Sequence, residues 1–152
     1  NGLSSEAFIA RLAGLGTLTS LTTPRKPLTA HEITVYLNNT CYSLVLDSTR
    51  IDENHPTHSL DAELLTQWIL DPILGISDLK TSDDIAFVPG NTPFVKVLNQ
   101  VNDGTFKVAF FLFTIPMSAV KKVADHGMYM PPKSTWVEPK LRSGLTIMDI
   151  HD

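Results

Sequence analysis

In the stretch ITVYLNNTCYSLVL (Ile33–Leu46), apolar residues alternate with polar ones up to an Asn-Asn pair, and a second apolar-rich run follows that pair. Alternation with a period of two places the apolar side chains on one face of a strand. Asparagine tolerates the positive φ angles that a two-residue hairpin turn requires. The stretch therefore predicts a β-hairpin with its turn at Asn38-Asn39.

The segments around this hairpin alternate between helical and strand-like patterns. Apolar residues at helical spacing, with capping residues beside them, predict four helices. The first lies within Asn1–Gly16 and the others span Leu60–Asp71, Phe94–Val101 and Met117–His126, the last closed by Gly127. Residues Thr17–Ala30 are rich in Thr, Leu and Pro without a helical period, and we expect a connector there.

Three further strands are expected in the second half of the chain. Asp84–Val88 reads as a short strand, Phe106–Thr114 as an almost wholly apolar central strand, and Leu145–Ile150 as a last strand. The Asp84–Thr114 unit then forms a right-handed βαβ crossover. The predicted fold class is α/β in the sense of a mixed α+β fold: a mixed sheet of about five strands with an N-terminal hairpin, a βαβ unit and three to four helices.

Length and composition fit one folded domain. The chain has 152 residues, of which 43% are hydrophobic and 18% charged, enough to bury about two-thirds of the unfolded surface. The single cysteine, Cys41, excludes an internal disulfide and a site made of several thiolates, and we expect it to be a small buried side chain. The longest apolar run has six residues, well short of the roughly 20 needed to cross a bilayer. We expect a cytoplasmic domain, residues 1–152, without a membrane partner.

The charges are unevenly distributed. The chain as a whole carries a net charge of −4, which argues against a dedicated nucleic-acid binder. Six basic residues and two acidic residues lie between Lys107 and Arg142. A local excess of this size suits a small anionic ligand better than a duplex.

The segment Met130–Leu145 (MPPKSTWVEPKLRSGL) is the strongest candidate for that ligand. Its side chains suit a phosphate group: two lysines and an arginine could neutralise charge, and three hydroxyls could donate hydrogen bonds. Prolines stiffen the segment, and a glycine permits close approach of the backbone. The candidate substrate- or phosphate-binding residues are Lys133, Ser134, Thr135, Lys140, Arg142, Ser143 and Gly144. The alternative is a rigid surface loop with solvated lysines. The segment is not a Walker A loop, because Pro131 and Pro132 remove two of the N–H donors such a loop needs.

Two other groups of residues have both a chemical and a structural interpretation. His126 and Asp125 could handle a substrate proton, but a histidine at a helix C-terminus also caps that helix. The loop Asp52–His58 (DENHPTH) could bind a divalent metal through two imidazoles and two carboxylates. A solvated loop is the preferred interpretation, because no distant further ligand can be identified, and we assign no metal ligands.

The run FFLFTIPMSAVKKVADHGMYMPPKSTWVEPKLRSGLTI (Phe110–Ile147) resembles the C-terminal signature of a bacterial family, the domain of unknown function numbered one thousand and fifteen. SLDAELLTQWILDPILGISD (Ser59–Asp78) and DIAFVPG (Asp84–Gly90) resemble earlier parts of the same pattern, so that nearly the whole chain is covered. The sequence departs from the family at Trp136-Val137-Glu138, where aromatic residues are usual.

The resemblance implies that the chain is the C-terminal part of a longer protein, with the N-terminal part as its partner. Family members carry a loose label as ParB-like, nucleic-acid-associated proteins, and some are linked to serine metabolism. Phosphoryl transfer involving serine or phosphoserine is therefore the expected activity, with Mg²⁺ and a nucleotide or pyrophosphate as the cofactors such chemistry implies. A ParB-like nucleic-acid protein is one alternative, although neither a basic face nor a helix-turn-helix is recognisable. The other is a non-catalytic domain for ligand binding or homo-oligomerisation.

Overall fold

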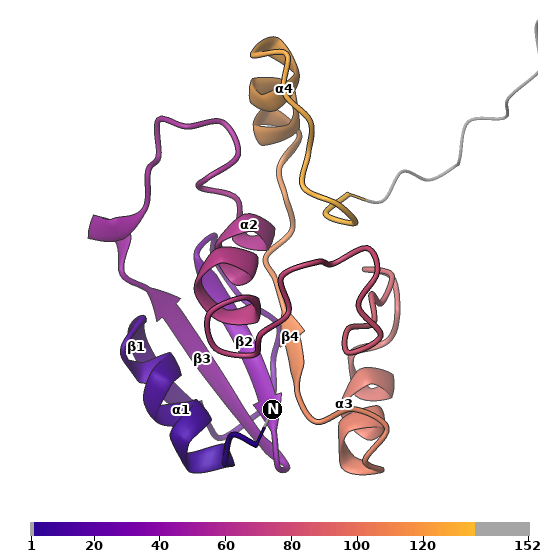
Figure 1. The fold of residues 1–152 in the computed structure, drawn as a ribbon. Helices are drawn as coiled ribbons and strands as arrows, with labels where there is room; N and C mark the ends of the chain where they lie inside the picture. Colours follow the sequence, from indigo (N-terminus) through magenta and orange to yellow (C-terminus); the bar gives the residue numbers. More distant parts are fainter. Residues whose placement is uncertain (1, 136–152) are drawn as a thin grey trace, which may run out of the picture.

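The computed structural model describes residues 2–135, which form a mixed α+β fold around an antiparallel sheet (Figure 1). Four strands occur in these residues: β1 (Gly16–Leu21), β2 (Glu32–Leu37), β3 (Thr40–Leu46) and β4 (Ala109–Phe111). The helices are α1 (Ser5–Ala13), α2 (Asp61–Leu65) continued by the π-helical turn η2 (Thr66–Leu70), α3 (Phe94–Asn102) and α4 (Met117–Asp125), with a 3₁₀ turn η1 at Ser48–Arg50.

The predicted hairpin forms the centre of the sheet. Leu37 pairs with Thr40, and the two turn residues Asn38 and Asn39 have φ angles of 48° and 60°. Two successive residues with positive φ give the turn type whose twist matches that of the flanking strands. The strand order is β1-β3-β2-β4, and every neighbouring pair is antiparallel.

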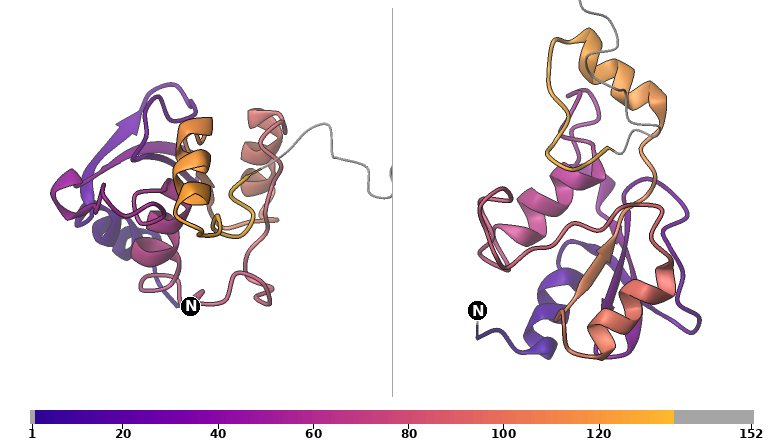
Figure 2. Two further views of the ribbon diagram at one scale, coloured as in Figure 1. Left: turned by 90° about the horizontal axis from the view of Figure 1, so that it is seen from above. Right: turned by 90° about the vertical axis from the view of Figure 1, so that its right-hand side faces the viewer.

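The two faces of this sheet pack against different elements. On one face, Ile33, Val35 and Leu44 are fully buried in an apolar core with Leu12 of α1 and Ile69 of η2. On the other face, a smaller cluster joins Tyr36, Cys41 and Ala109 to Val97 and Val101 of α3. Figure 2 shows α1 and α3 on opposite sides of the sheet. The helices α1 and α3 thus close the two sides of one central sheet.

The order of the strands corrects two predictions. Residues Asp84–Val88 are not a strand, so the predicted parallel βαβ crossover does not form. The apolar run Phe106–Thr114 contributes only β4, and β4 lies at an edge of the sheet rather than at its centre. An apolar run does not by itself require a central strand, because helices can also bury the side chains of an edge strand. Here α3 and α1 cover β4 from its two faces: Phe94 contacts Phe111, and Phe8 contacts Phe110.

The connector predicted at Thr17–Ala30 is also wrong in its first part. Residues Gly16–Leu21 form β1, which pairs with β3 over six residues. Gly16 permits this pairing, because a Cβ atom there would lie 2.1 Å from the Val45 carbonyl oxygen. The predicted last strand, Leu145–Ile150, lies outside the described residues.

The helices agree closely with the predictions. α1 begins after Ser4, whose side chain accepts a hydrogen bond from Ala7 N–H, and α4 is followed by Gly127 with a φ of 65°. Cys41 is buried as expected, and burial raises the pKa of its thiol.

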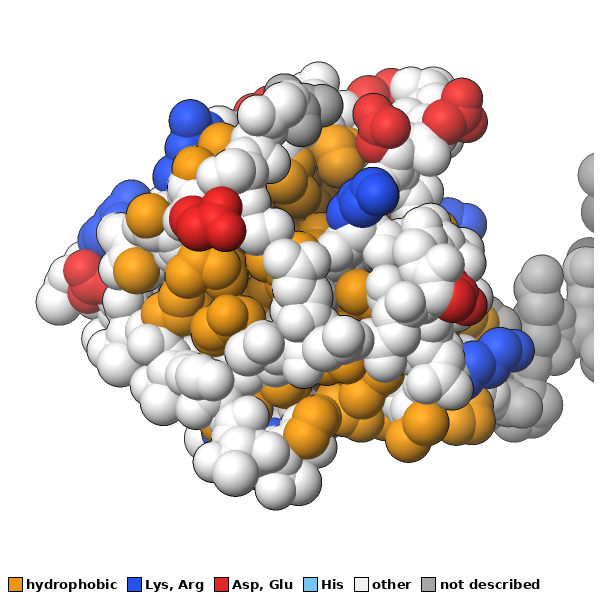
Figure 3. Space-filling model, turned by 90° about the horizontal axis from the view of Figure 1, so that it is seen from below, with side chains coloured by type: hydrophobic (Ala, Val, Ile, Leu, Met, Phe, Trp, Pro, Cys, Tyr) orange, Lys and Arg blue, Asp and Glu red, His pale blue; other side chains and the backbone are white. Residues whose placement is uncertain are grey.

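Hydrophobic side chains also remain on the surface. The view from below, which looks onto the hairpin turn and the ends of α1 and α3, shows more hydrophobic than charged side chains (Figure 3). Large hydrophobic residues with exposed side chains occur along much of the described chain: Leu28, Val45, Phe87, Val88, Val95, Met117, Met128 and Tyr129.

Candidate anion-binding site

The first half of the predicted phosphate segment forms a tight turn. Ser134 donates two hydrogen bonds to the Pro131 carbonyl oxygen, one from its backbone N–H (3.2 Å) and one from its hydroxyl (2.6 Å). Lys133 occupies the left-handed region at φ 59°. The side chains of Lys133 and Thr135 are exposed, while Ser134 is half-buried. The turn therefore presents an ammonium group and a threonine hydroxyl to solvent from a defined backbone.

The backbone of Lys133 is unusual for its residue type. The left-handed region costs a residue with a Cβ about 1 kcal/mol or more. The other non-glycine residues with positive φ in residues 2–135 have evident reasons: Asn38 and Asn39 form the hairpin turn, and the backbone N–H of His31 donates to Asp61. For Lys133 the only structural reason within residues 2–135 is the turn that Ser134 closes by donating to the Pro131 carbonyl oxygen.

The remaining residues of the predicted site, Lys140, Arg142, Ser143 and Gly144, lie outside the described residues. The structure thus places three of the seven candidates, Lys133, Ser134 and Thr135, and these three are adjacent in one turn.

The two candidate proton-handling residues lie at the C-terminal end of α4, Asp125 as its last residue and His126 as the C-cap, and both make local contacts. His126 Nδ1 lies 2.8 Å from the Lys122 carbonyl oxygen at the C-terminus of the helix. Asp125 lies 3.9 Å from the ammonium group of Lys121. These contacts fit the capping interpretation of His126. After Gly127 the chain reverses its direction and runs back alongside α4 (Figures 1 and 2), and the Met128 N–H donates to the Val123 carbonyl oxygen at this reversal.

Two lysines of the basic stretch have partners in the described chain. Lys122 Nζ donates to the Glu53 carbonyl oxygen at 2.8 Å, which ties α4 to the loop before α2. Lys121 faces Asp125, as described above. Lys107 and Lys133 are both exposed and make no ion pair within residues 2–135, and of these two only Lys133 lies in the predicted phosphate segment.

The histidine-rich loop is organised by its own side chains. Asp52 accepts hydrogen bonds from the backbone N–H groups of Asn54 and His55. The rings of His55 and His58 stack with their centroids 3.5 Å apart. In the part of the chain that the structure describes, no three His, Cys, Asp or Glu side chains form a group that could hold a metal ion.

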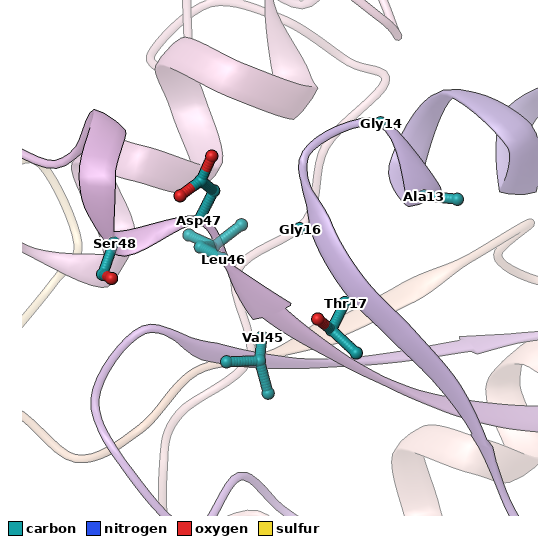
Figure 4. Close-up of a pocket in the computed structure, with 8 residues that line it drawn as sticks. All are labelled: Ala13, Gly14, Gly16, Thr17, Val45, Leu46, Asp47 and Ser48. Atoms are coloured by element: carbon teal, nitrogen blue, oxygen red, sulfur yellow. The ribbon is translucent and has the colours of Figure 1, made fainter.

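An open cavity of about 460 Å³ lies elsewhere, where α1 meets β1 and the end of β3 (Figure 4). Asp47 supplies the one charged side chain among its eight lining residues. That carboxylate accepts two hydrogen bonds from Thr49, which lower its pKa. The cavity shares no residue with the basic segment and offers no positive charge to an anion.

The structure also contains a buried charge that sequence reasoning missed. Glu32 on β2 is 3% exposed and lies 2.7 Å from the Arg25 guanidinium. It also accepts hydrogen bonds from the Ser43 hydroxyl and the Leu28 N–H. Burial alone would raise the pKa of Glu32, but these donors and the Arg25 charge outweigh burial and lower the pKa to about 2. This network holds the segment between β1 and β2 against the sheet.

A second cluster joins the beginning of β2 to α2. The His31 ring lies between the Ser59 carbonyl oxygen (3.0 Å from Nε2) and the Glu53 carboxylate (3.5 Å from Nδ1). The His31 backbone N–H donates to Asp61, whose carboxylate is buried. Burial raises the pKa of Asp61, and the hydrogen bond from His31 opposes that rise. Both ring nitrogens of His31 are in use, so we assign this cluster a structural role.

None of the helices described in residues 2–135 has the length and apolarity needed to cross a bilayer.

Comparison with known proteins found no relative of this chain: no protein-family model, curated protein or solved structure matches it significantly.

Proposed function

We propose that this chain is the phosphate-binding part of an enzyme that transfers a phosphoryl group to or from serine. The observation that carries the proposal is the Pro131–Ser134 turn, which holds an exposed Lys133 in a strained backbone conformation beside two hydroxyl residues. Strained non-glycine residues concentrate at binding and catalytic sites, because the surrounding structure must hold them there against their preference.

The turn contributes charge and hydrogen bonds to the proposed site. Lys133 neutralises a phosphate oxygen as a point charge, and the Thr135 hydroxyl donates to a second oxygen. The Ser134 hydroxyl, which donates to Pro131, keeps its lone pairs for accepting from a protonated phosphate or an ammonium group. In the transfer to serine, the serine hydroxyl oxygen forms the new P–O bond, the P–O bond to the donor breaks with its electron pair staying on the departing donor phosphate, and that phosphate takes up the hydroxyl proton; transfer from phosphoserine is the reverse.

The resemblance of the PPKST…PK…SGL stretch to the family described above is the second support for the proposal. In this proposal Lys140 and Arg142 complete the positive charge, and Ser143 and Gly144 contact the phosphate. A nucleotide or pyrophosphate is the phosphoryl donor.

Binding of phosphoserine by the 152-residue chain tests the site directly. We expect phosphoserine to shift the backbone amide resonances of Ser134 and Thr135, and Lys133→Ala to weaken binding about tenfold, as loss of one charge-assisted contact implies. Lys121→Ala is the matched control, because Lys121 faces Asp125 on α4 and lies outside the turn. Equal affinities for Lys133→Ala and Lys121→Ala contradict the site.

Turnover by the longer protein is the second test. The double variant Lys133→Ala/Ser134→Ala should lose most of the activity towards serine or phosphoserine. An unchanged rate means that the site assignment is wrong. Binding of duplex DNA by that protein, weakening steeply with salt, would instead favour the nucleic-acid alternative.

A further inference from the structure

Strand β1 is an open edge of the sheet. It pairs with β3 on one side, and none of the hydrogen bonds described for residues 2–135 joins its backbone to anything on the other side. An edge of this kind presents unpaired N–H and C=O groups that can accept another strand.

The hydrogen-bond register identifies which backbone groups face outward. The Asp47 N–H donates to the Leu15 carbonyl oxygen, so Leu15 and Asp47 form a hydrogen-bonded pair just before β1. Hydrogen-bonded and non-hydrogen-bonded pairs alternate along an antiparallel ladder. The backbone groups of Thr17, Thr19 and Leu21 therefore point towards β3. Those of Gly16, Leu18 and Ser20 point outward, which gives three donors and three acceptors.

This edge lacks the features by which proteins usually block strand addition. Its sequence, GTLTSL, contains no charged residue and no proline, and its six residues make it twice as long as β4 at the opposite edge. Short edge strands, charges, prolines and bulges are the common means of protection. An open groove of about 430 Å³ lies between α1 and the hairpin, and Tyr42, which pairs with Ser20 of β1, is one of its lining residues: Ser5, Glu6, Ile9, Ala10, Ala13, Leu37, Asn38 and Tyr42.

We propose that β1 pairs with β1 of a second copy of this chain, antiparallel, with the two-fold axis at Leu18. In this register Leu18 faces Leu18 of the second copy, and Gly16 faces Ser20. All six outward backbone groups on each chain are then hydrogen-bonded, and the two sheets become one sheet of eight strands.

The sequence of β1 favours a second copy over an unrelated strand. Antiparallel pairing with itself places no like charges opposite each other, because β1 has none. The Leu18 side chain, which is half-buried against the main core on the α1 face, meets its own copy there, so that the pair extends an apolar surface. On the opposite face Thr17 meets Thr19, a favourable cross-strand pair.

Cysteine cross-linking tests both the interface and its register. The Cα atoms of a directly opposed hydrogen-bonded pair lie about 5.5 Å apart, within the range of a disulfide. We therefore expect Leu18→Cys to form a disulfide-linked dimer under mild oxidation. Thr17→Cys is the matched control, because two copies of residue 17 would lie diagonally, at about 8 Å, too far to bridge. The native Cys41 is buried and adds little background.

Sedimentation velocity on the unmodified chain supplies the second measurement. We expect a concentration-dependent species of twice 16.8 kDa. Ser20→Pro removes an outward N–H without removing a bond to β3 and should abolish that species, with the far-ultraviolet circular dichroism retained. A monomer at all concentrations overturns the proposal, and so does equal cross-linking of Leu18→Cys and Thr17→Cys. Neither result depends on Ser20→Pro, so the proposal stays testable if that variant fails to fold.

Discussion

The two faces of the sheet are stabilised in different ways, although the same hairpin supplies both. The face towards α1 and α2 is apolar, with Ile33, Val35 and Leu44 fully buried. The other face carries Glu32, Thr34 and Ser43, which are also buried. Alternation along the strands therefore produces one face that is wholly apolar and one on which buried polar groups lie beside the smaller apolar cluster with α3.

The consequences of substitution differ accordingly. On the apolar face, the loss of side-chain volume leaves a cavity. On the polar face, the loss of one partner leaves a buried group without its hydrogen bond, which costs free energy although almost no volume changes. Four substitutions or titrations separate these effects, with expected changes from about 4 to about 1 kcal/mol.

The largest effect is expected on the apolar face. Leu44→Ala should lower the free energy of unfolding by about 4 kcal/mol, because Leu44 is fully buried in the main core. Urea unfolding followed by circular dichroism measures the change. Val45→Ala, one residue further along β3 and 46% exposed, is the control and should cost less than about 1 kcal/mol. Similar losses for the two variants would contradict the difference between the faces.

Acid should act mainly through the polar face. The folded pKa of Glu32, about 2, lies below its ordinary value of 4.5, so the unfolded chain binds a proton first as the pH falls. Above pH 4.5 the contribution of Glu32 is complete and should amount to about 3 kcal/mol, and it is lost as the pH falls from 4.5 to about 2.

Stability measured against pH in the wild type and in Glu32→Gln isolates this contribution. The difference between the two proteins should shrink as the pH falls through this window. Asp61, whose folded pKa is raised, acts in the opposite direction in both proteins and cancels from the comparison. Parallel curves would show that Glu32 is not stabilised by its partners.

Removing the cation should cost less than removing core volume. Arg25→Met leaves Glu32 buried without its guanidinium partner, and we expect a loss of about 2 kcal/mol. This is below the usual range for a fully buried pair, because a third of the Arg25 side chain is exposed. Lys26→Met is the control, since Lys26 is exposed and should change the free energy of unfolding by about 0.5 kcal/mol or less. Equal losses for the two variants would contradict a role for the ion pair.

The smallest effect is expected to have the opposite sign. The Thr34 hydroxyl is buried and has no hydrogen-bond partner among the described residues. Thr34→Val keeps the shape and removes the unsatisfied group, so it should stabilise the protein by about 1 kcal/mol. Ser43→Ala is the contrasting variant, because Ser43 donates to Glu32 and its loss should destabilise. Destabilisation by Thr34→Val would mean that this hydroxyl has a partner in solution.

The elements with local signals could be predicted from the sequence. The Asn38-Asn39 turn follows from turn chemistry, and the four helices follow from helical spacing, helped at α1 by the Ser4 cap, all of which act within a few residues. Of the predicted site, the structure describes only Lys133, Ser134 and Thr135, which share one turn because they are adjacent in sequence. The other four candidates lie outside the described residues. Whether distant candidates such as His126 reach that turn depends on the path of the chain after α4.

The sequence by itself determined the fold class, the central hairpin and the helices, because periodicity and turn residues encode these locally. Only the tertiary structure decided that Gly16–Leu21 is a strand, that β4 lies at an edge, and that Arg25 meets Glu32. Each of these depends on partners elsewhere in the chain, such as β3 for β1 and the segment before β2 for Glu32. Strand pairing and burial of charge are properties of such non-local contacts, and their energies appear only when the partners meet.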